Sequence, residues 1–233
     1  DDLPDAPQGG AGSRAPAYSP ARLVKGGDVR AAYTVDKSGV DPETWDRYER
    51  GQDRALEERK QIVSIITDEA AGRVPILAGA AEANIDLVLE ACAYCADFGC
   101  TAVSVTGPYY FNVSQESIEH YFRELAARSP IDILLYNIPQ FSNEIGVDIV
   151  ERLAMDCPRI IGIKDSSRDM PRFMNTLGKI KPQRPDFICL TGTEETLLPT
   201  LLMGGDGGTI ATSGVAPEAV MKLYRDWQRG DLE

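Results

Sequence analysis

Short apolar runs rich in β-branched residues alternate along this chain with longer amphipathic stretches. The apolar runs predict seven strands: Val29–Thr34, Val74–Ala78, Ala102–Thr106, Asp132–Tyr136, Ile160–Lys164, Asp186–Thr191 and Gly208–Ala211. The stretches between them carry apolar residues at helical spacing, such as Ile118, Phe122 and Leu125. Regular alternation of strand and helix indicates a parallel sheet with helical crossovers.

The strands are nearly continuous in apolar residues, so we expect both faces of the sheet to be covered. Consecutive units of this kind favour a closed (β/α)₈ TIM barrel over an open doubly wound sheet, and no glycine-rich dinucleotide motif follows the first strand. Such a barrel needs eight strands to close. The pattern predicts helices near Asp41–Arg50 and from Ala55 to Ala71 with no strand between them, so we expect an incomplete barrel.

The first 27 residues are rich in Pro, Gly, Ala and Ser and have few large apolar residues. This composition is typical of a disordered tail, and we expect residues 1–27 to form one. The remaining residues, 28–233, are enough for one sizeable core. We therefore expect a single barrel domain over residues 28–233.

Charge and cysteine content narrow the functional classes. The chain has 24 Lys and Arg against 36 Asp and Glu, a net charge of −12, which disfavours nucleic acid and membrane surfaces as partners. No apolar run approaches the roughly 20 residues of a membrane helix, and we expect no secretory signal. Five cysteines do not indicate a disulfide framework, so we expect a cytoplasmic protein. A single histidine, His120, excludes a zinc site built on several histidines.

Two reactive side chains end consecutive predicted strands, Tyr136 and Lys164. Parallel neighbours lie about 4.8 Å apart, and functional groups of a βα barrel gather at this end of its strands. In a mostly apolar mouth the lysine loses hydration, so its neutral, nucleophilic amine becomes populated, and Gly162 leaves space below its stem. A tyrosine hydroxyl can relay protons. These are the parts of a Schiff-base aldolase; the alternative is a solvated lysine paired with Asp165 beside a half-buried tyrosine.

Two other motifs are interpreted as structural. Cys92 and Cys95 form a C-x-x-C motif but share one apolar stripe of a predicted helix, so we expect both in the core. The glycine-rich run from Met203 to Gly208 precedes its strand, which places it at the stability face of a barrel. We interpret it as a helix end and turn.

Four motifs together resemble the dihydrodipicolinate synthase / N-acetylneuraminate lyase family, over about Asp28 to the end of the chain. In order they are Gly107-Pro108-Tyr109-Tyr110, Tyr136-Asn137-Ile138-Pro139, Gly162-Ile163-Lys164-Asp165-Ser166-Ser167 and Gly192-Thr193-Glu194-Glu195. The resemblance implies a barrel in which Lys164 forms a Schiff base with pyruvate or another 2-keto acid and Tyr136 relays protons, without metal or cofactor. It also implies a homo-oligomer, a dimer or tetramer, in which Tyr110 reaches a neighbouring subunit's site.

One departure from the family bears on the substrate. The synthase branch places an arginine two residues after the proline of the Tyr-Asn-x-Pro motif, where it binds the carboxylate of the aldehyde; this chain has Phe141 there. An apolar ring cannot make that contact. The resemblance therefore favours a lyase that cleaves a 2-keto-3-deoxy sugar acid or an N-acetylneuraminate-like substrate to pyruvate and an aldehyde. Dihydrodipicolinate synthesis, from pyruvate and aspartate semialdehyde, is the alternative.

The substrate-binding positions that the resemblance implies lie around the same strand ends. They are Phe141, Ser166, Glu194, Glu195, Gly208 and Thr209. For the two glutamates a second interpretation stays open, a charged first helical turn favoured by the helix dipole.

A second departure concerns the binding of pyruvate itself. The family's Gly-Thr-Thr-Gly-Glu-like loop after the second strand, which holds the pyruvate carboxylate, is not found between Arg50 and Ala55. The helices that follow the eighth barrel unit are not found before the end at Glu233, so we expect a barrel truncated at its C-terminus. A non-catalytic homologue that retains the barrel is therefore a further alternative.

Overall fold

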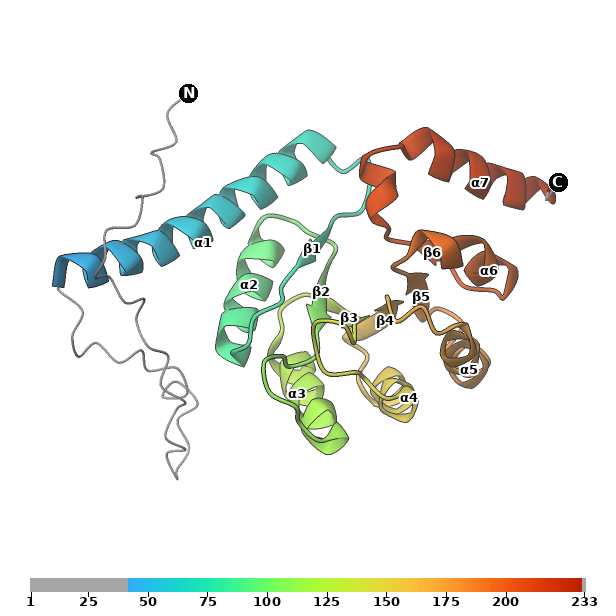
Figure 1. Cartoon of the computed structure of the whole chain (residues 1–233), viewed down its shortest axis with the longest axis horizontal. Coiled ribbons are helices and arrows are strands. Elements are labelled where there is room, and N and C mark those ends of the chain that lie inside the picture. The colour runs from blue at the N-terminus through green and yellow to red at the C-terminus, as the bar shows by residue number, and fades with distance from the viewer. Residues whose placement is uncertain (1–41, 232–233) are drawn as a thin grey trace, which may run out of the picture. The chain divides into compact units, whose positions relative to one another are not determined.

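A computed structural model describes residues 42–231 of the chain, with side chains from residue 56 onward (Figure 1). The chain divides into two compact units, Asp1–Arg59 and Lys60–Glu233, and the second holds all six strands of the described part. The expected tail, residues 1–27, and the first expected strand, Val29–Thr34, lie outside the described residues.

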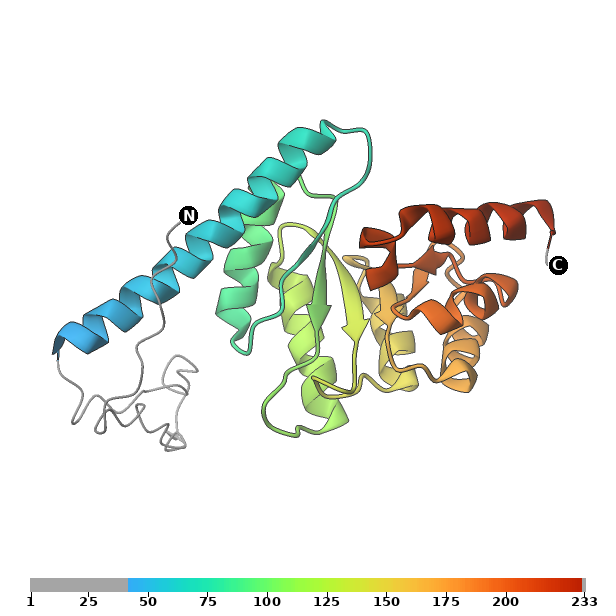
Figure 2. The same cartoon turned by 45° about the horizontal axis from the view of Figure 1, so that its top comes forward.

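The strands form one parallel sheet in which each strand pairs with the next along the chain (Figure 2). They are β1 (Leu77–Gly79), β2 (Ala102–Thr106), β3 (Asp132–Asn137), β4 (Ile160–Asp165), β5 (Ile188–Thr191) and β6 (Gly207–Gly208). All six overlap strands that the sequence predicts. Sequential order, parallel pairing and intervening helices make this an incomplete (β/α)₈ barrel.

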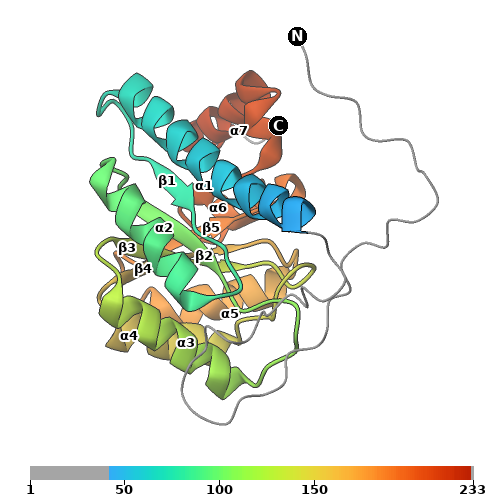
Figure 3. The same ribbon diagram turned by 90° about the vertical axis from the view of Figure 1, so that its left-hand side faces the viewer.

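The helices alternate with the strands and pack beside one another on the sheet, as Figure 3 shows for α2 and α3. They are α2 (Ile85–Asp97), α3 (Gln115–Arg128), α4 (Val147–Asp156), α5 (Met170–Ile180), α6 (Leu197–Leu202) and α7 (Pro217–Arg229), with short 3₁₀ helices η2 (Glu194–Thr196) and η3 (Ala211–Gly214). Local capping sets where several of them begin. The side chain of Ser114 accepts from the amide of Ser117 before α3, and that of Asp169 accepts from the amide of Arg172 before α5.

One helix, α1 (Pro42–Ala70), stands where the sequence predicts two. The expectation of separate helices at Asp41–Arg50 and Ala55–Ala71 is therefore wrong. Between Arg50 and Ala55 the sequence has a single glycine and no proline, and one interior glycine costs a helix only about 1 kcal/mol. The expected absence of a strand at this place holds in the structure.

The two outermost described strands are shorter than expected. Val74–Ala78 is predicted and Leu77–Gly79 is observed; Gly208–Ala211 is predicted and Gly207–Gly208 is observed. Within the described part, β1 pairs only with β2 and β6 only with β5. The bounds of a strand that has a hydrogen-bonded neighbour on one side only are set by how far that neighbour extends. The apolar pattern of the sequence does not reveal this length.

The core lies between the sheet and its helices. Its largest fully buried side chains come from both layers and include Ile118, Phe122, Leu125, Ile133, Leu135, Leu153 and Ile163. Cys92 and Cys95 are fully buried in α2, as the apolar stripe predicts, and none of the five cysteines, all of which lie in the described part of the chain, forms a disulfide. Burial raises the pKa of Cys189 to about 12, so that thiol stays protonated at neutral pH.

The glycine-rich run before β6 ends a helix, as expected. Met203 caps α6, and Gly204 follows it with a φ of 89°, a left-handed conformation that favours glycine. Within residues 42–231, no helix combines the length and apolarity that crossing a membrane requires.

Gly162 is a point of close packing in β4. A Cβ at this position would lie 2.4 Å from the carbonyl oxygen of Ile188 and 2.7 Å from Cδ1 of Leu134. The space that the sequence suggested below the stem of Lys164 is thus filled by neighbouring strands. Gly162 allows these strands to pack at this distance.

Replacing Gly162 with alanine should destabilise the fold by about 1–3 kcal/mol, because the added methyl group overpacks the sheet. Gly178→Ala is a matched control, since Gly178 lies inside α5 and has open space around its Cβ position. That variant should gain about 0.5–1 kcal/mol from helix propensity. Urea unfolding of both variants measures the difference; equal stabilities would contradict the packing argument.

Candidate active site

Tyr136 and Lys164 lie side by side at the carboxyl ends of β3 and β4. They are direct partners in the parallel register, and Nζ of Lys164 lies 4.0 Å from the centroid of the Tyr136 ring. Both side chains are partly buried. An ammonium group at this distance is attracted by the face of the ring. The structure thus brings together the two residues that the strand order predicts as neighbours.

Asp165 does not pair with Lys164, contrary to the alternative that the sequence left open. Consecutive residues of a strand point to opposite faces of the sheet. The buried Asp165 carboxylate instead accepts from Nε of Arg172 at 3.0 Å, from Nδ2 of Asn137 at 3.1 Å and from the amide of Ser167 at 2.8 Å. Removing one member of a buried pair of this kind typically costs about 3–5 kcal/mol.

Ser166 presents a buried hydroxyl beside the lysine. The residue is 6% exposed, and its Oγ has no hydrogen-bond partner among the described residues. A Cβ on Gly192 would lie 1.8 Å from this Oγ and 2.9 Å from Cε of Lys164, so only glycine fits at the end of β5. Buried hydroxyls are rarely left unpaired in proteins, so this one is available to a bound polar group.

Glu194 and Glu195 begin the helical turn after β5, in η2, as the helix-turn interpretation predicts. Both are exposed and both are engaged. Glu194 accepts from the amide of Thr212 at 3.0 Å and from its hydroxyl at 2.6 Å, and Glu195 pairs with Nε of Arg168 at 2.9 Å. The hydrogen bonds from Thr212 lower the pKa of Glu194 to about 2. A substrate hydroxyl would have to share or displace these partners.

Gly208 and Thr209 lie at the end of β6, the last strand of the described sheet. The amide of Thr209 donates to the carbonyl of Thr191 at 2.8 Å, which continues the pairing with β5. A Cβ on Gly208 would lie 2.9 Å from Cδ1 of Leu197, so the missing side chain makes room for α6. Both residues are exposed in the chain as described.

Tyr110 and Phe141 lie together in a different place, a surface hollow of about 200 Å³ between the loops that follow β2 and β3. Each is 78% exposed. Tyr110 has a φ of 79°, a strained value for a residue with a side chain, and its ring contacts that of Phe111 edge-on, with 4.7 Å between centroids. Of the expected site residues, these two project farthest into solvent.

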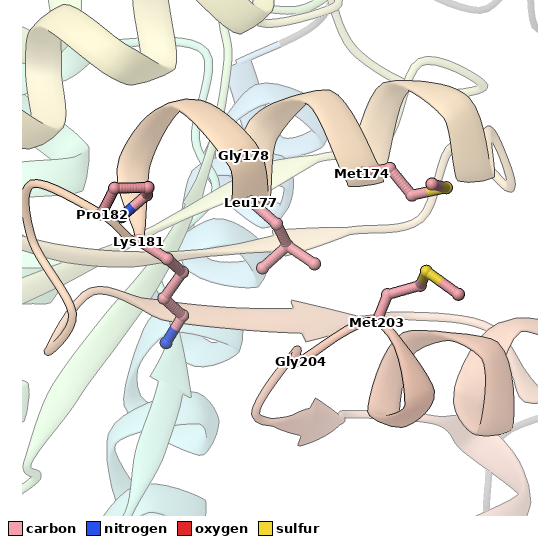
Figure 4. A pocket seen from close by; sticks show the side chains of 7 residues that line it. All are labelled: Met174, Leu177, Gly178, Lys181, Pro182, Met203 and Gly204. Carbon is pink, nitrogen blue, oxygen red and sulfur yellow. The ribbon is translucent and has the colours of Figure 1, made fainter.

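A larger hollow, of about 550 Å³, contains none of the expected site residues. It lies between α5 and α6 and is lined by Met174, Leu177, Gly178, Lys181, Pro182, Met203 and Gly204 (Figure 4). Lys181 is held there by Asp206, at 2.8 Å. The larger hollow is thus not where the sequence predicts the site.

Sequence reasoning missed Arg172 and assigned no role of its own to Gly192. Arg172 lies in a helix whose sequence marks it only as polar, and its contact with Asp165 is tertiary. Gly192 could have been noticed from its place directly after a strand. Among the described residues, no group of three or more His, Cys, Asp and Glu side chains is arranged to hold a metal ion.

Comparison with known proteins gives one family. A sequence model of the dihydrodipicolinate synthetase family matches residues 51–233. Among curated relatives, the probable 2-dehydro-3-deoxy-D-pentonate aldolase YjhH of Escherichia coli is 31% identical over 69% of this chain and 54% of its own length. A 4-hydroxy-tetrahydrodipicolinate synthase of Methanopyrus kandleri is 33% identical over 76% of this chain and 58% of its own length.

Solved structures agree. The crystal structure of YagE, a prophage protein of the dihydrodipicolinic acid synthase family from E. coli in complex with pyruvate, superposes with a TM-score of 0.72. It is 32% identical over 76% of this chain and 59% of that chain. The 2-keto-3-deoxygluconate aldolase from Picrophilus torridus gives 0.69 at 32% identity, over 74% and 61%. This chain therefore spans little more than half the length of its relatives.

Replacing Glu194 with glutamine should flatten the acid side of the stability profile. The folded chain holds the pKa of Glu194 at about 2, against 4.5 for an ordinary glutamate, so folding favours the ionised form. Its stabilising contribution is fully present above about pH 4.5 and is lost as the pH falls through about 2. The variant should lose stability less steeply across this range, with a slope difference of up to about one proton.

Urea unfolding at a series of pH values measures these slopes. Thr212→Val removes the hydroxyl donor and keeps the amide, so its slope should lie between those of the glutamine variant and the unmodified chain. Parallel profiles of stability against pH for the glutamine variant and the unmodified chain would contradict the lowered pKa of Glu194.

Proposed function

Because this chain belongs to the dihydrodipicolinate synthetase family, we propose that it carries the reaction centre of a Schiff-base lyase, with Lys164 as nucleophile. The observation that carries the proposal is the pairing of Lys164 with Tyr136, with 4.0 Å between ammonium nitrogen and ring centroid. The amine adds to the keto carbon of pyruvate or another 2-keto acid, and loss of water gives an iminium ion. When the bond between C3 and C4 of the 2-keto acid then breaks, its electron pair passes to the iminium and gives an enamine, whose protonation and hydrolysis release pyruvate and free the lysine.

Tyr136 is the proposed proton relay. Forming the iminium requires protonation of the departing hydroxyl, and releasing the aldehyde requires removal of a hydroxyl proton. Tyr136 stands directly opposite Lys164 in the ladder, and its phenol is the titratable group of the neighbouring strand end. The reaction needs neither metal nor cofactor.

The proposed substrate is a 2-keto-3-deoxy sugar acid or an N-acetylneuraminate-like compound, cleaved to pyruvate and an aldehyde. Phe141 supports this choice, because its ring cannot bind the carboxylate that aspartate semialdehyde carries. The names of YjhH and of the P. torridus relative point to the same substrate class. Dihydrodipicolinate synthesis remains the alternative, and the M. kandleri relative bears that name.

Ser166, with its buried and unpaired hydroxyl, is the proposed contact for the keto acid. For the aldehyde half, the proposed contacts are Glu194, Glu195, Gly208 and Thr209, which lie at or after the ends of β5 and β6. We further propose a cytoplasmic homo-oligomer, a dimer or tetramer, in which the exposed Tyr110 reaches the neighbouring subunit's site. Five buried cysteines, none of them in a disulfide, support the reducing compartment.

Incubation with pyruvate and borohydride should convert Lys164 to a reduced pyruvyl adduct, detected by intact mass and peptide mapping. Lys164→Arg should abolish the adduct, because a guanidinium is not nucleophilic. Tyr136→Phe should slow its formation by about 10²–10⁴-fold through loss of the proton relay.

The control is Lys222→Arg, on the exposed face of α7, which should leave the adduct unchanged. A chain that forms no adduct under conditions that trap YagE would favour the non-catalytic homologue, an alternative motivated by the carboxylate-binding loop that the sequence lacks.

The two enzyme alternatives differ in their second substrate. We expect cleavage of a 2-keto-3-deoxy sugar acid, followed as pyruvate release, to exceed condensation of pyruvate with aspartate semialdehyde by at least about tenfold, since a missing bidentate carboxylate contact costs at least that factor. A faster condensation would reverse the substrate assignment and leave the Schiff-base chemistry intact.

A further inference from the structure

On the helix side of the sheet, Arg172 contacts groups that lie next to both of the proposed reacting residues, Tyr136 and Lys164. The guanidinium lies in the first turn of α5 with its side chain 8% exposed. Its Nε donates to Asp165 at 3.0 Å, Nη2 donates to the carbonyl of Ile145, and Nη1 pairs with Glu144 at 3.1 Å. Asp165 follows Lys164 in β4, and Ile145 lies in the segment between β3 and α4.

Asn137, the residue after Tyr136, joins the same group. Its Nδ2 donates to Asp165 at 3.1 Å, and its Oδ1 accepts from the amide of Ile145 at 3.0 Å. Its backbone carbonyl accepts from the amide of Ser166 at 2.8 Å. The residues directly after Tyr136 and Lys164 are therefore fixed to one another and to Arg172.

This arrangement bears on chemistry at the opposite face. Side chains alternate along a strand, so a constraint on Asp165 from the helix side also fixes the direction in which Lys164 leaves the backbone. The same holds for Asn137 and Tyr136. Buried charges held by several hydrogen bonds have one well-defined geometry, and reactions between positioned groups are sensitive to displacements of about 1 Å.

We propose that Arg172 is a positioning residue for the reaction at Lys164, acting through Asp165 and Asn137 without touching the substrate. The proposal rests on the proposed Schiff-base function. It assigns to a helix residue the alignment of amine and phenol that the chemistry requires.

The chain offers a matched control at the other end of β4. Arg184 has a side chain 17% exposed, and its Nη1 donates to the carbonyls of Ile160 at 2.8 Å and Ala154 at 2.6 Å. It therefore secures the start of the same strand, as Arg172 secures its end. Loss of Arg184 should weaken the fold without changing the direction of Lys164.

The experiment compares Arg172→Gln, Arg172→Lys and Arg184→Gln in the full chain. Urea unfolding gives the stability of each, and pyruvate–borohydride trapping at a range of pyruvate concentrations gives the maximal rate and the half-saturating concentration. Arg172→Gln should lower the maximal trapping rate by about tenfold or more, with a smaller change in half-saturation. Arg172→Lys should recover part of that loss, because it keeps the charge beside Asp165. Arg184→Gln should be destabilised yet trap within about twofold of the unmodified chain.

Two results would overturn the positioning role: a maximal rate for Arg172→Gln equal to that of the unmodified chain, or an equal loss of rate in Arg184→Gln. If Arg172→Gln does not fold, the double variant Arg172→Gln with Asp165→Asn takes its place, because it leaves no unpaired buried charge.

A separate measurement distinguishes failure of this proposal from failure of the Schiff-base function. Reductive methylation by formaldehyde and borohydride, mapped at Lys164 with Lys222 as internal reference, reports on the amine without pyruvate. If the unmodified chain forms no pyruvate adduct, the lyase proposal fails. In that case, faster methylation of Lys164 in Arg172→Gln but not in Arg184→Gln would still support positioning, and unchanged methylation would overturn it.

Discussion

The parallel register between β3 and β4 is the constraint on which the candidate site depends. It sets Tyr136 opposite Lys164 and, one residue later, Asn137 opposite Asp165. Because side chains alternate along a strand, the first pair faces the side of the proposed reaction and the second faces the helices. If β4 shifted by one residue, Asp165 would stand opposite Tyr136 and its carboxylate would lie on the side of the proposed reaction. The same backbone hydrogen bonds thus determine the positions of the proposed reacting pair and of the buried pair behind it.

The bounds of strands at the centre of the sheet could be read from sequence, whereas strands at its borders were found with bounds that differ. β2, β3 and β4 are apolar runs whose ends match the pattern to within one residue, because pairing with a neighbouring strand runs along nearly their full length. β1 and β6 are cut short where their single described neighbour ends. The continuous helix α1 was predicted as two helices. The sequence pattern permits a break between them but does not require one.

In the candidate site, too, some residues could be predicted from the sequence and others could not. Tyr136 and Lys164 could be found because each lies at the carboxyl end of a central strand, and the apolar pattern indicates the bounds of the central strands. Arg172 could not be found, because its partners Asp165 and Ile145 come from other segments of the chain and only tertiary packing brings them together. Glu194 is an intermediate case. Its place in a helical turn was foreseen, but not Thr212, which holds its carboxylate.

Asp165 and Ser166 are neighbours in sequence that differ in their hydrogen bonding: Asp165 is bonded within the chain, whereas the hydroxyl of Ser166 is available to a ligand. Asp165 accepts three hydrogen bonds from within the chain, from Arg172, Asn137 and the amide of Ser167, out of about four that a carboxylate can accept, so it has little capacity left for a ligand. Ser166, one residue on, is equally buried, and its hydroxyl has no partner within the described part of the chain. A buried hydroxyl left unpaired is unfavourable in the free protein, and a polar group bound beside Lys164 would relieve that cost. Gly192 approaches both this hydroxyl and the stem of Lys164, so the two side chains lie close to one another. The favourable energy of binding would therefore be gained next to the amine that we propose as the nucleophile.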